Sequence, residues 1–240
     1  MGFVINNNLA ANNTYRSLNA TQNDLSKSLE KLSTGLRINR AGDDAAGLSI
    51  SEGLKSQVTG SAQAARNAQD GISVIQTAEG ALTEVHSILQ RVRDLAVQAG
   101  NDSNNADART AIKAESDALG DELTRIGDST NFNTIKLLDG SASALTFQVG
   151  AGSTAAEDQI VVDLSGADIS TLGATVKALT FDTAANALAS VGSVDTEIKS
   201  ISTERSNIGA VQNRLEHTIK SLNVAGENLQ AAQSRIADVD

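Results

Sequence analysis

The chain contains no proline in its 240 residues, so the usual interruption of a helix from within is missing. Aromatic residues are almost as scarce, with four Phe, one Tyr and no Trp. Ala, Leu, Ile and Val therefore supply the apolar surface, and small aliphatic side chains pack better between close helices than around a thick core. The sequence predicts a mainly α fold, an elongated bundle of long antiparallel helices.

Composition also excludes several kinds of site and partner. The absence of cysteine removes disulfides, thiolate zinc sites and thiol nucleophiles. A net charge of −10 argues against nucleic acid as a partner. No apolar run approaches the roughly 18 residues of a membrane span, and the first residues do not match a secretory signal peptide. We expect no nucleic-acid partner, no membrane partner, no metal and no cofactor.

An apolar seam with steps of four and three residues runs through the first helical segment. An isolated helix of this kind is marginal in water, so it packs against copies of itself or a partner, or folds back onto its own chain. We favour the first, because the charged stretch RINRAGDD separates this segment from the rest of the chain. The seam consists of Ala11, Tyr15, Leu18, Gln22, Leu25, Leu29, Leu32 and Leu36.

Two more helices are expected after this interruption. Asp43 or Asp44 is a natural N-cap for a helix from about residue 44 to 99, with its negative charge at the positive end of the helix dipole. The run GNDSNNAD at 100–107 then supplies a turn and a new N-cap, so a third helix to about Gly127 should lie antiparallel to the second. One side of this helix is expected to hold Ala108, Ile112, Glu115, Leu119, Leu123 and Ile126.

The middle of the chain has a different pattern. Short β-rich runs at 145–149 and 159–164, separated by Gly, Ser and Ala, predict one or two hairpins. GAGSTA at 150–155 formally fits a dinucleotide-binding loop, but a strand follows it where that loop needs a helix, so we favour a hairpin loop. A helical stripe returns from about residue 184 to the last residue.

No catalytic constellation emerges from the sequence. His86 and His217 lie on long helices without a second histidine at ligand spacing, and Asp43 and Asp44 are better explained as capping residues than as an acid–base pair. We therefore expect a protein that is not an enzyme.

The stretch LSTGLRINRAGDDAAGLSISEGLKSQ closely resembles the N-terminal signature of bacterial flagellin. LQRVRDLAVQAGN, FNTIKLLDG, FQVGAG and IGAVQNRLEHTIKSLNVAGENLQAAQSRIADVD are similar to further flagellin blocks, in the family's order. The resemblance covers nearly the whole chain apart from about residues 165–186. It implies a secreted structural subunit that self-assembles into the extracellular flagellar filament for motility.

The resemblance also implies a division of the chain. Leu18, Leu25, Leu29, Leu32 and Leu36 become self-assembly residues of a helix in the filament core, and Asp43 and Asp44 cap the helix after a connector. The expected parts are the filament-core helix at 1–36, the connector at 37–44, outer-tube helices at 45–129, a β-hairpin segment and variable region at 130–183, and the C-terminal long helix at 184–240.

Several partners follow from the same resemblance: other copies of the chain, the flagellar type III export apparatus, a FliS-type chaperone, and the filament cap and hook-associated proteins. The segment resembling LQRVRDLAVQ is the one that the innate immune receptor TLR5 recognises in many flagellins, where it is buried between filament subunits. The corresponding residues are Arg91, Leu95 and, on the third helix, Glu115; Asp94, where Glu is commoner, is a departure. Because flagellins continue beyond ADVD into a helix that pairs with the first one and binds the chaperone, we expect a truncated or processed form that polymerises poorly.

Two alternatives remain open at this stage. A hook–filament junction protein shares flagellin-like termini, although the uninterrupted block QNRLEHTIKSLNVAGENL favours flagellin. A cytoplasmic helical signalling rod would have a longer unbroken helical hairpin and no strands, so the β-rich runs between residues 145 and 164 argue against it.

Overall fold

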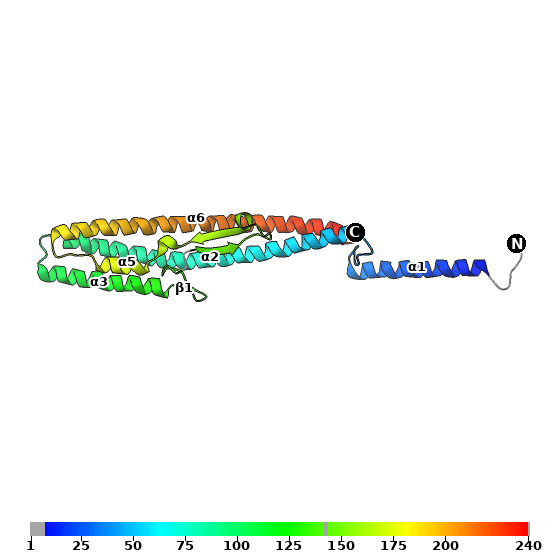
Figure 1. The fold of residues 1–240 in the computed structure, drawn as a ribbon, viewed down its shortest axis with the longest axis horizontal. Coiled ribbons are helices and arrows are strands. Elements are labelled where there is room, and N and C mark those ends of the chain that lie inside the picture. Colours follow the sequence, from blue (N-terminus) through cyan, green and yellow to red (C-terminus); the bar gives the residue numbers. More distant parts are fainter. Residues whose placement is uncertain (1–7, 142–143, 240) are drawn as a thin grey trace. The chain divides into compact units, whose positions relative to one another are not determined.

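The computed structural model describes residues 8–141 and 144–239, so the first seven residues of the expected filament-core helix lie outside the described part (Figure 1). The chain divides into two units. The first comprises Met1–Gly60 with Val224–Asp240, and the second comprises Ser61–Asn223. The helices α2 (Ala45–Ala99) and α6 (Ala184–Ala237) contribute residues to both.

The first unit begins with α1 (Leu9–Thr34). The side chain of Asn8 caps it by accepting the N–H of Ala11 at 3.1 Å, and Gly35 ends it with a left-handed φ of 72°, a conformation that glycine adopts without steric cost. The predicted helix is therefore confirmed, but it ends before Leu36. That residue instead forms an isolated antiparallel β-bridge with Asp238, just after the end of α6.

The second unit is built on the antiparallel pair of α2 and α6, which are 55 and 54 residues long (Figure 1). Two ion pairs join them: Arg93 to Asp195 at 2.6 Å, and Arg205 to Glu79 at 2.8 Å. As the residue number rises on one helix it falls on the other, which confirms the expected antiparallel packing. Apolar side chains from both helices form the core, including Ile75, Leu82, Leu89, Ile208 and Leu215.

Helix α3 (Ala106–Ser129) follows a turn and is capped by Asn105, whose side chain accepts the N–H of Ala108 at 2.8 Å. The predicted N-cap cluster is confirmed. Of the residues expected on one side of this helix, Ile112 and Leu123 are buried, whereas Glu115 is exposed. The residues that α3 buries are Ile112, Ser116, Gly120, Leu123 and Gly127.

The expected hairpins are present in the middle of the chain. Strands β1 (Asn131–Phe132) and β2 (Ile135–Lys136) pair antiparallel, as do β3 (Ala144–Gln148) and β4 (Gln159–Asp163). The GAGSTA run lies between β3 and β4 and leads into the single turn α4 (Ala155–Asp158), where the Asp158 carboxylate accepts the N–H groups of Gly152 and Thr154. The protein's own carboxylate thus occupies the donors that a phosphate would need, and the hairpin-loop interpretation is confirmed.

A short helix follows that the sequence did not predict. After the 3₁₀ turn η1 (Ser165–Ala167), helix α5 (Ser170–Lys177) packs against α3 (Figure 1). The two backbones approach closely because glycines face each other: a Cβ on Gly173 would lie 2.5 Å from the carbonyl oxygen of Gly120. Leu172 and Val176 of α5 are buried in the core.

Candidate interaction surfaces

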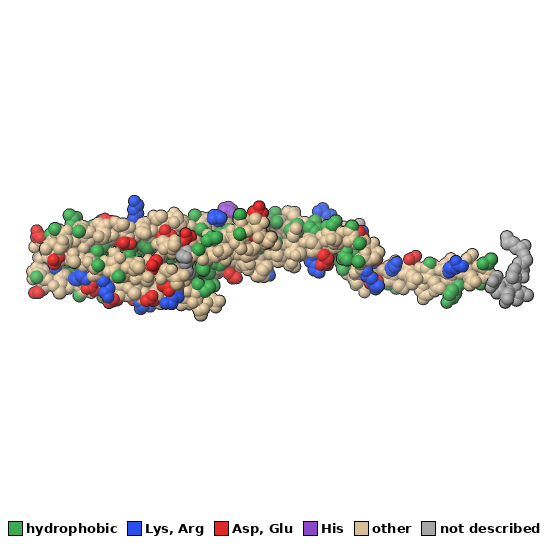
Figure 2. Space-filling model, in the orientation of Figure 1, with side chains coloured by type: hydrophobic (Ala, Val, Ile, Leu, Met, Phe, Trp, Pro, Cys, Tyr) green, Lys and Arg blue, Asp and Glu red, His purple; other side chains and the backbone are tan. Residues whose placement is uncertain are grey.

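The first candidate surface is the apolar face of α1. None of the described residues of this helix is buried. Leu25 is 58% exposed and Leu32 is 77% exposed, and Leu18 and Leu29 are similarly open. Hydrophobic side chains are visible on the surface of this helix in Figure 2. Burying one such side chain contributes about 1.5–3 kcal/mol, so the seam is a strong surface for another helix.

The connector after α1 is held by its two aspartates, which have different roles. Asp44 caps α2 by accepting the N–H of Gly47 at 2.9 Å. Asp43 instead accepts the N–H groups of Arg40 at 3.0 Å and Asn39 at 3.2 Å. These two backbone donors, Arg40 first and then Asn39, lower the pKa of the Asp43 carboxyl from its ordinary value. The structure therefore assigns the cap to Asp44 and the connector turn to Asp43.

The connector also contacts the end of α6 within the same unit. The N–H of Arg37 donates to the carbonyl oxygen of Ala237 at 2.7 Å, and its guanidinium donates to that of Ile236 at 2.6 Å. In return, the N–H of Val239 donates to the carbonyl oxygen of Gly35 at 3.0 Å. These bonds satisfy carbonyl groups that the end of a helix leaves unpaired, so the connector closes α6 in the way a C-cap does.

The second candidate surface is formed by α2 and α3 around Arg91. Its guanidinium donates to one carboxylate oxygen of Glu115 through Nε at 2.9 Å and through Nη2 at 2.7 Å. Both side chains are about half exposed, so the pair can be reached from solvent and adds little stability by itself. Leu95, one turn further along α2, is only 1% exposed. The structure thus brings Arg91 and Glu115 together on the surface and places Leu95 in the core.

Comparison with known families gives two matches. Residues 5–143 match the bacterial flagellin N-terminal helical region, and residues 191–240 match the bacterial flagellin C-terminal helical region. A flagellin of Halalkalibacterium halodurans is 52% identical over 99% of this chain and 86% of its own length. The chain belongs to the bacterial flagellin family. It is a structural subunit of the flagellar filament.

Further relatives agree with this assignment. A Bacillus subtilis flagellin is 46% identical over 98% of this chain and 87% of its own length. The crystal structure of Bacillus cereus flagellin, 34% identical, matches with a TM-score of 0.57 over 65% of this chain and 88% of that one. A putative flagellar hook-associated protein from Vibrio parahaemolyticus shares the fold, with a TM-score of 0.65 over 82% of this chain and all of that one, but is only 15% identical.

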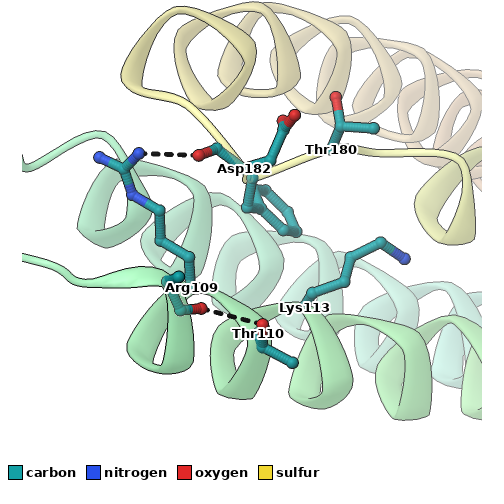
Figure 3. A pocket seen from close by; sticks show the side chains of 7 residues that line it. Arg109, Thr110, Lys113, Thr180 and Asp182 are labelled. Carbon is teal, nitrogen blue, oxygen red and sulfur yellow. Dashed lines mark hydrogen bonds between the residues drawn. The ribbon is translucent and has the colours of Figure 1, made fainter.

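This flagellin has a hollow at the end of the second unit where α3 begins and α5 joins α6. Figure 3 shows it lined by Arg109, Thr110 and Lys113 of α3 and by Thr180 and Asp182 of the loop. The Lys113 ammonium forms an ion pair with the Asp117 carboxylate and donates a hydrogen bond to the Lys177 carbonyl oxygen at 3.0 Å. The charged groups of the hollow are thus used within the fold.

The described part of this flagellin shows neither a metal-binding cluster of side chains nor a helix suited to cross a membrane. Across residues 8–141 and 144–239, His, Asp and Glu side chains do not gather in threes in a way that could hold a metal ion. Over the same stretches, every helix is too short or too polar to pass through a membrane.

Proposed function

We propose that α1 carries the contacts by which this flagellin assembles into the filament, through Leu18, Leu25, Leu29, Leu32 and the adjoining Leu36. The observation that supports this is the contrast between two apolar stripes. The apolar stripe of α2 and α6 is buried or half-buried in the core, whereas the apolar stripe of α1 is exposed along its described length. A seam with this spacing fits another helix, and family membership places this chain among other copies of itself in the filament.

Regrowth of filaments tests this proposal. Purified monomers of the parent chain and of each variant are added to short seeds cut from parent filaments, and the pelleted filament is compared. Leu25→Gln should reduce pelleted filament at least tenfold, because it places a polar amide in the seam. Ala20→Gln adds the same side chain on the opposite face of α1 and should regrow like the parent protein. Normal regrowth of Leu25→Gln would contradict the proposal.

We also propose that the surface around Arg91 and Glu115 is the one that TLR5 recognises. The resemblance of LQRVRDLAVQ to the recognised segment motivates this, and the exposed ion pair gives the receptor two charged groups on adjacent helices. Leu95 contributes from beneath by holding α2 in place, since its side chain is buried.

Cell signalling by purified monomer tests the receptor surface. Arg91→Asp should abolish signalling while leaving the thermal midpoint nearly unchanged, because an exposed ion pair contributes at most about 1 kcal/mol. Arg125→Asp is the matched control, since Arg125 forms a similar exposed pair with Glu122 on α3. Leu95→Ala must be compared at equal folded fraction, because it removes a core side chain at a cost of about 2–5 kcal/mol. Unchanged potency of Arg91→Asp would reject the assignment.

The remaining partners are proposed on family membership. They are the type III export apparatus, a FliS-type chaperone, and the filament cap and hook-associated proteins. The corresponding location is the extracellular filament, and the experiment is to shear the cells, pellet the filaments and identify this chain by mass. A chain that stays in the cell in an export-competent strain would contradict export.

The identities decide between the open alternatives. A flagellin 52% identical over 99% of the chain favours the filament over the hook–filament junction, since the hook-associated likeness is one of fold. The paired strands β3 and β4 argue against a helical signalling rod.

A further inference from the structure

The connector is attached to its neighbours in the first unit in different ways. On the α6 side it uses the main chain, because the N–H of Arg37 donates to the carbonyl oxygen of Ala237 at 2.7 Å. The side chain of Ile38 is buried and packs against the start of α2, where a Cβ on Gly47 would lie 2.7 Å from its Cδ1 atom. These contacts fix the connector to the ends of α2 and α6.

On the α1 side the connector is held through side chains. Among residues 8–141 and 144–239, no main-chain hydrogen bond joins residues 36–44 to α1. Instead, the carboxamide of Asn39 donates to the hydroxyl oxygen of Thr34 at 2.7 Å. The guanidinium of Arg40 donates to one carboxylate oxygen of Glu30 through Nε at 3.0 Å, and its Nη2 atom lies 2.9 Å from the same oxygen. Both contacts cross from the connector to the last turns of α1.

Gly35 lies between α1 and the connector and is suited to act as a pivot. Its φ is 72°, and a Cβ at this position would meet no atom within 4 Å, so packing does not oppose rotation of the chain here. None of the described residues of α1 is buried, so the helix is not held by a core either. The orientation of α1 relative to the connector therefore depends on the side-chain contacts of Thr34 and Glu30.

The charges on the two sides of this pivot are complementary. Glu30 of α1 meets Arg40 of the connector, and two lysines of α1 act on Asp43. The pKa of the Asp43 carboxyl is lowered first by the N–H groups of Arg40 and the residue before it, and further by the positive charges of Lys31 and Lys27. The Arg40 side chain is 74% exposed and that of Glu30 is 36% exposed, so salt can screen their attraction. The screening length falls from about 10 Å in 0.1 M salt to about 3 Å in 1 M salt.

We propose that the connector is a salt-sensitive joint that sets the orientation of α1 in the free subunit, with Gly35 as its pivot and the Glu30–Arg40 pair as its latch. The latch is closed at low ionic strength and opens as salt screens the pair. An exposed ion pair shifts such an equilibrium by about two- to fivefold. The joint determines where the exposed seam of α1 is presented, and it does not depend on which helix covers that seam.

Distances between two spin labels on the free monomer, measured by double electron–electron resonance, test the joint. The chain has no cysteine, so Ser17→Cys on α1 and Ser56→Cys on α2 supply the two labelling sites, and both positions are exposed. Raising the salt from about 0.1 M to about 1 M should increase the population outside the main distance peak about two- to fivefold. Arg40→Gln should give this increase already at low salt and remove most of the response to salt.

Two matched controls separate the joint from general effects of charge and of glycine replacement. Lys55→Gln removes the same charge from an exposed pair with Glu52 inside α2 and should behave like the parent. Gly35→Ala disfavours the left-handed φ and should move the main distance peak. Gly53→Ala, at a helical position of α2 where a Cβ also meets no atom within 4 Å, should leave the peak in place.

Each result has a definite meaning. A parent distribution that does not respond to salt would overturn the inference, as would equal changes in Arg40→Gln and Lys55→Gln. One broad distribution shared by the parent and every variant would also overturn it, because no latch would then form. Circular dichroism of the same samples verifies that α1 stays helical. Failure of the assembly proposal is seen separately, since Leu25→Gln affects regrowth and should leave these distances unchanged.

Discussion

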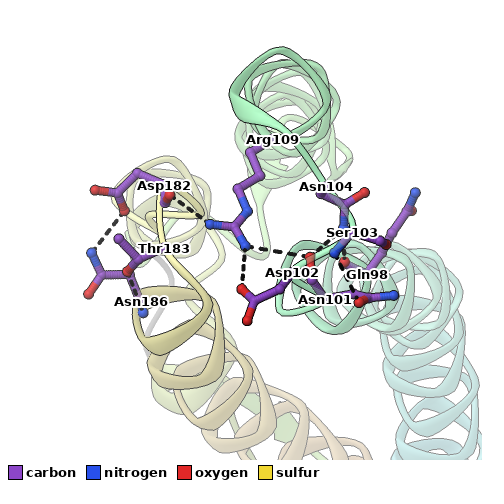
Figure 4. Close-up of polar contacts among 9 residues, drawn as sticks. All are labelled: Gln98, Asn101, Asp102, Ser103, Asn104, Arg109, Asp182, Thr183 and Asn186. Carbon is purple, nitrogen blue, oxygen red and sulfur yellow. Dashed lines mark hydrogen bonds and ion pairs between the residues drawn. The ribbon is translucent and has the colours of Figure 1, made fainter.

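The guanidinium of Arg109 donates to the backbone carbonyl oxygen of Asp182 across 2.9 Å, joining the start of α3 to the loop that leads into α6 (Figure 4). Its second terminal nitrogen lies 3.3 Å from the Asp102 carboxylate in the turn between α2 and α3. Only 13% of the Arg109 side chain is exposed. One arginine thus connects two loops at this end of the second unit.

We predict that Arg109→Ala lowers the free energy of unfolding by about 2–3 kcal/mol, because it removes charged hydrogen bonds and leaves the Asp182 carbonyl without this donor. Urea unfolding of the monomer measures the change. Arg125→Ala removes an exposed arginine from the same helix and should cost at most about 0.5 kcal/mol. Equal effects of the two variants would show that the loop contact is not what stabilises this end.

The contact between α3 and α5 gives a second prediction. A Cβ at Gly173 would lie 2.5 Å from the Gly120 carbonyl oxygen, so Gly173→Ala should separate the two helices and cost about 1–3 kcal/mol. Gly192 in α6 is the control, because a Cβ there meets nothing within 4 Å. Gly192→Ala should raise stability by about 0.5–1 kcal/mol through its higher helix propensity. Thermal melts of both variants should therefore shift in opposite directions.

The connector should respond to acid through Asp43. The pKa of the Asp43 carboxyl is lower in the folded chain than in the unfolded chain, where it is about 3.9. The ionised carboxylate therefore stabilises the connector at any pH above about 3.9. This stabilisation is lost as the pH falls from that value towards the lower pKa of the folded chain. Hydrogen exchange of the Asn39 and Arg40 amides, corrected for intrinsic rates, should show protection that is full above about pH 4 and declines as the pH is lowered further.

Two variants distinguish this cause from general acid unfolding. Asp43→Ala should leave both amides unprotected at every pH. Asp24→Ala, on the exposed face of α1, should keep the parent profile because Asp24 does not accept these amides. Retained protection in Asp43→Ala would show that another acceptor holds the turn.

Periodicity in the sequence predicted the long helices well, since the stripes of α2 and α6 are repeated many times and each is buried along one side. It could not predict α5, which is eight residues long and contains Gly173. That helix depends on contact with Gly120, which is distant in sequence. Local patterns carry no information about such a pairing.

The features of the candidate surfaces were likewise predictable only where the sequence carries a local signal. The exposed seam of α1 could be expected from the sequence, because the apolar spacing and the charged interruption after it are both local features. The bonds from Arg37 to Ile236 and Ala237 join residues about 200 positions apart, so no local signal could reveal them. Leu95 was placed with Arg91 from a motif, which does not distinguish an exposed contact from a buried support.

The turn between β1 and β2 gives the last prediction. Phe132 pairs with Ile135, so Asn133 and Thr134 form a two-residue loop, with φ of 47° and 68°. Positive φ at both positions suits Asn followed by Gly, whereas a β-branched residue is strained there.

Thr134→Gly should therefore raise the free energy of unfolding by about 1 kcal/mol, the relief of strain exceeding the entropy lost by glycine on folding. For a unit of this size the thermal midpoint should rise by about 2–4 °C. Thr146→Gly, in the regular strand β3, is the control and should lower the midpoint, since glycine weakens a strand interior. If Thr134→Gly also lowered it, contacts of the Thr134 side chain would outweigh the strain of its backbone.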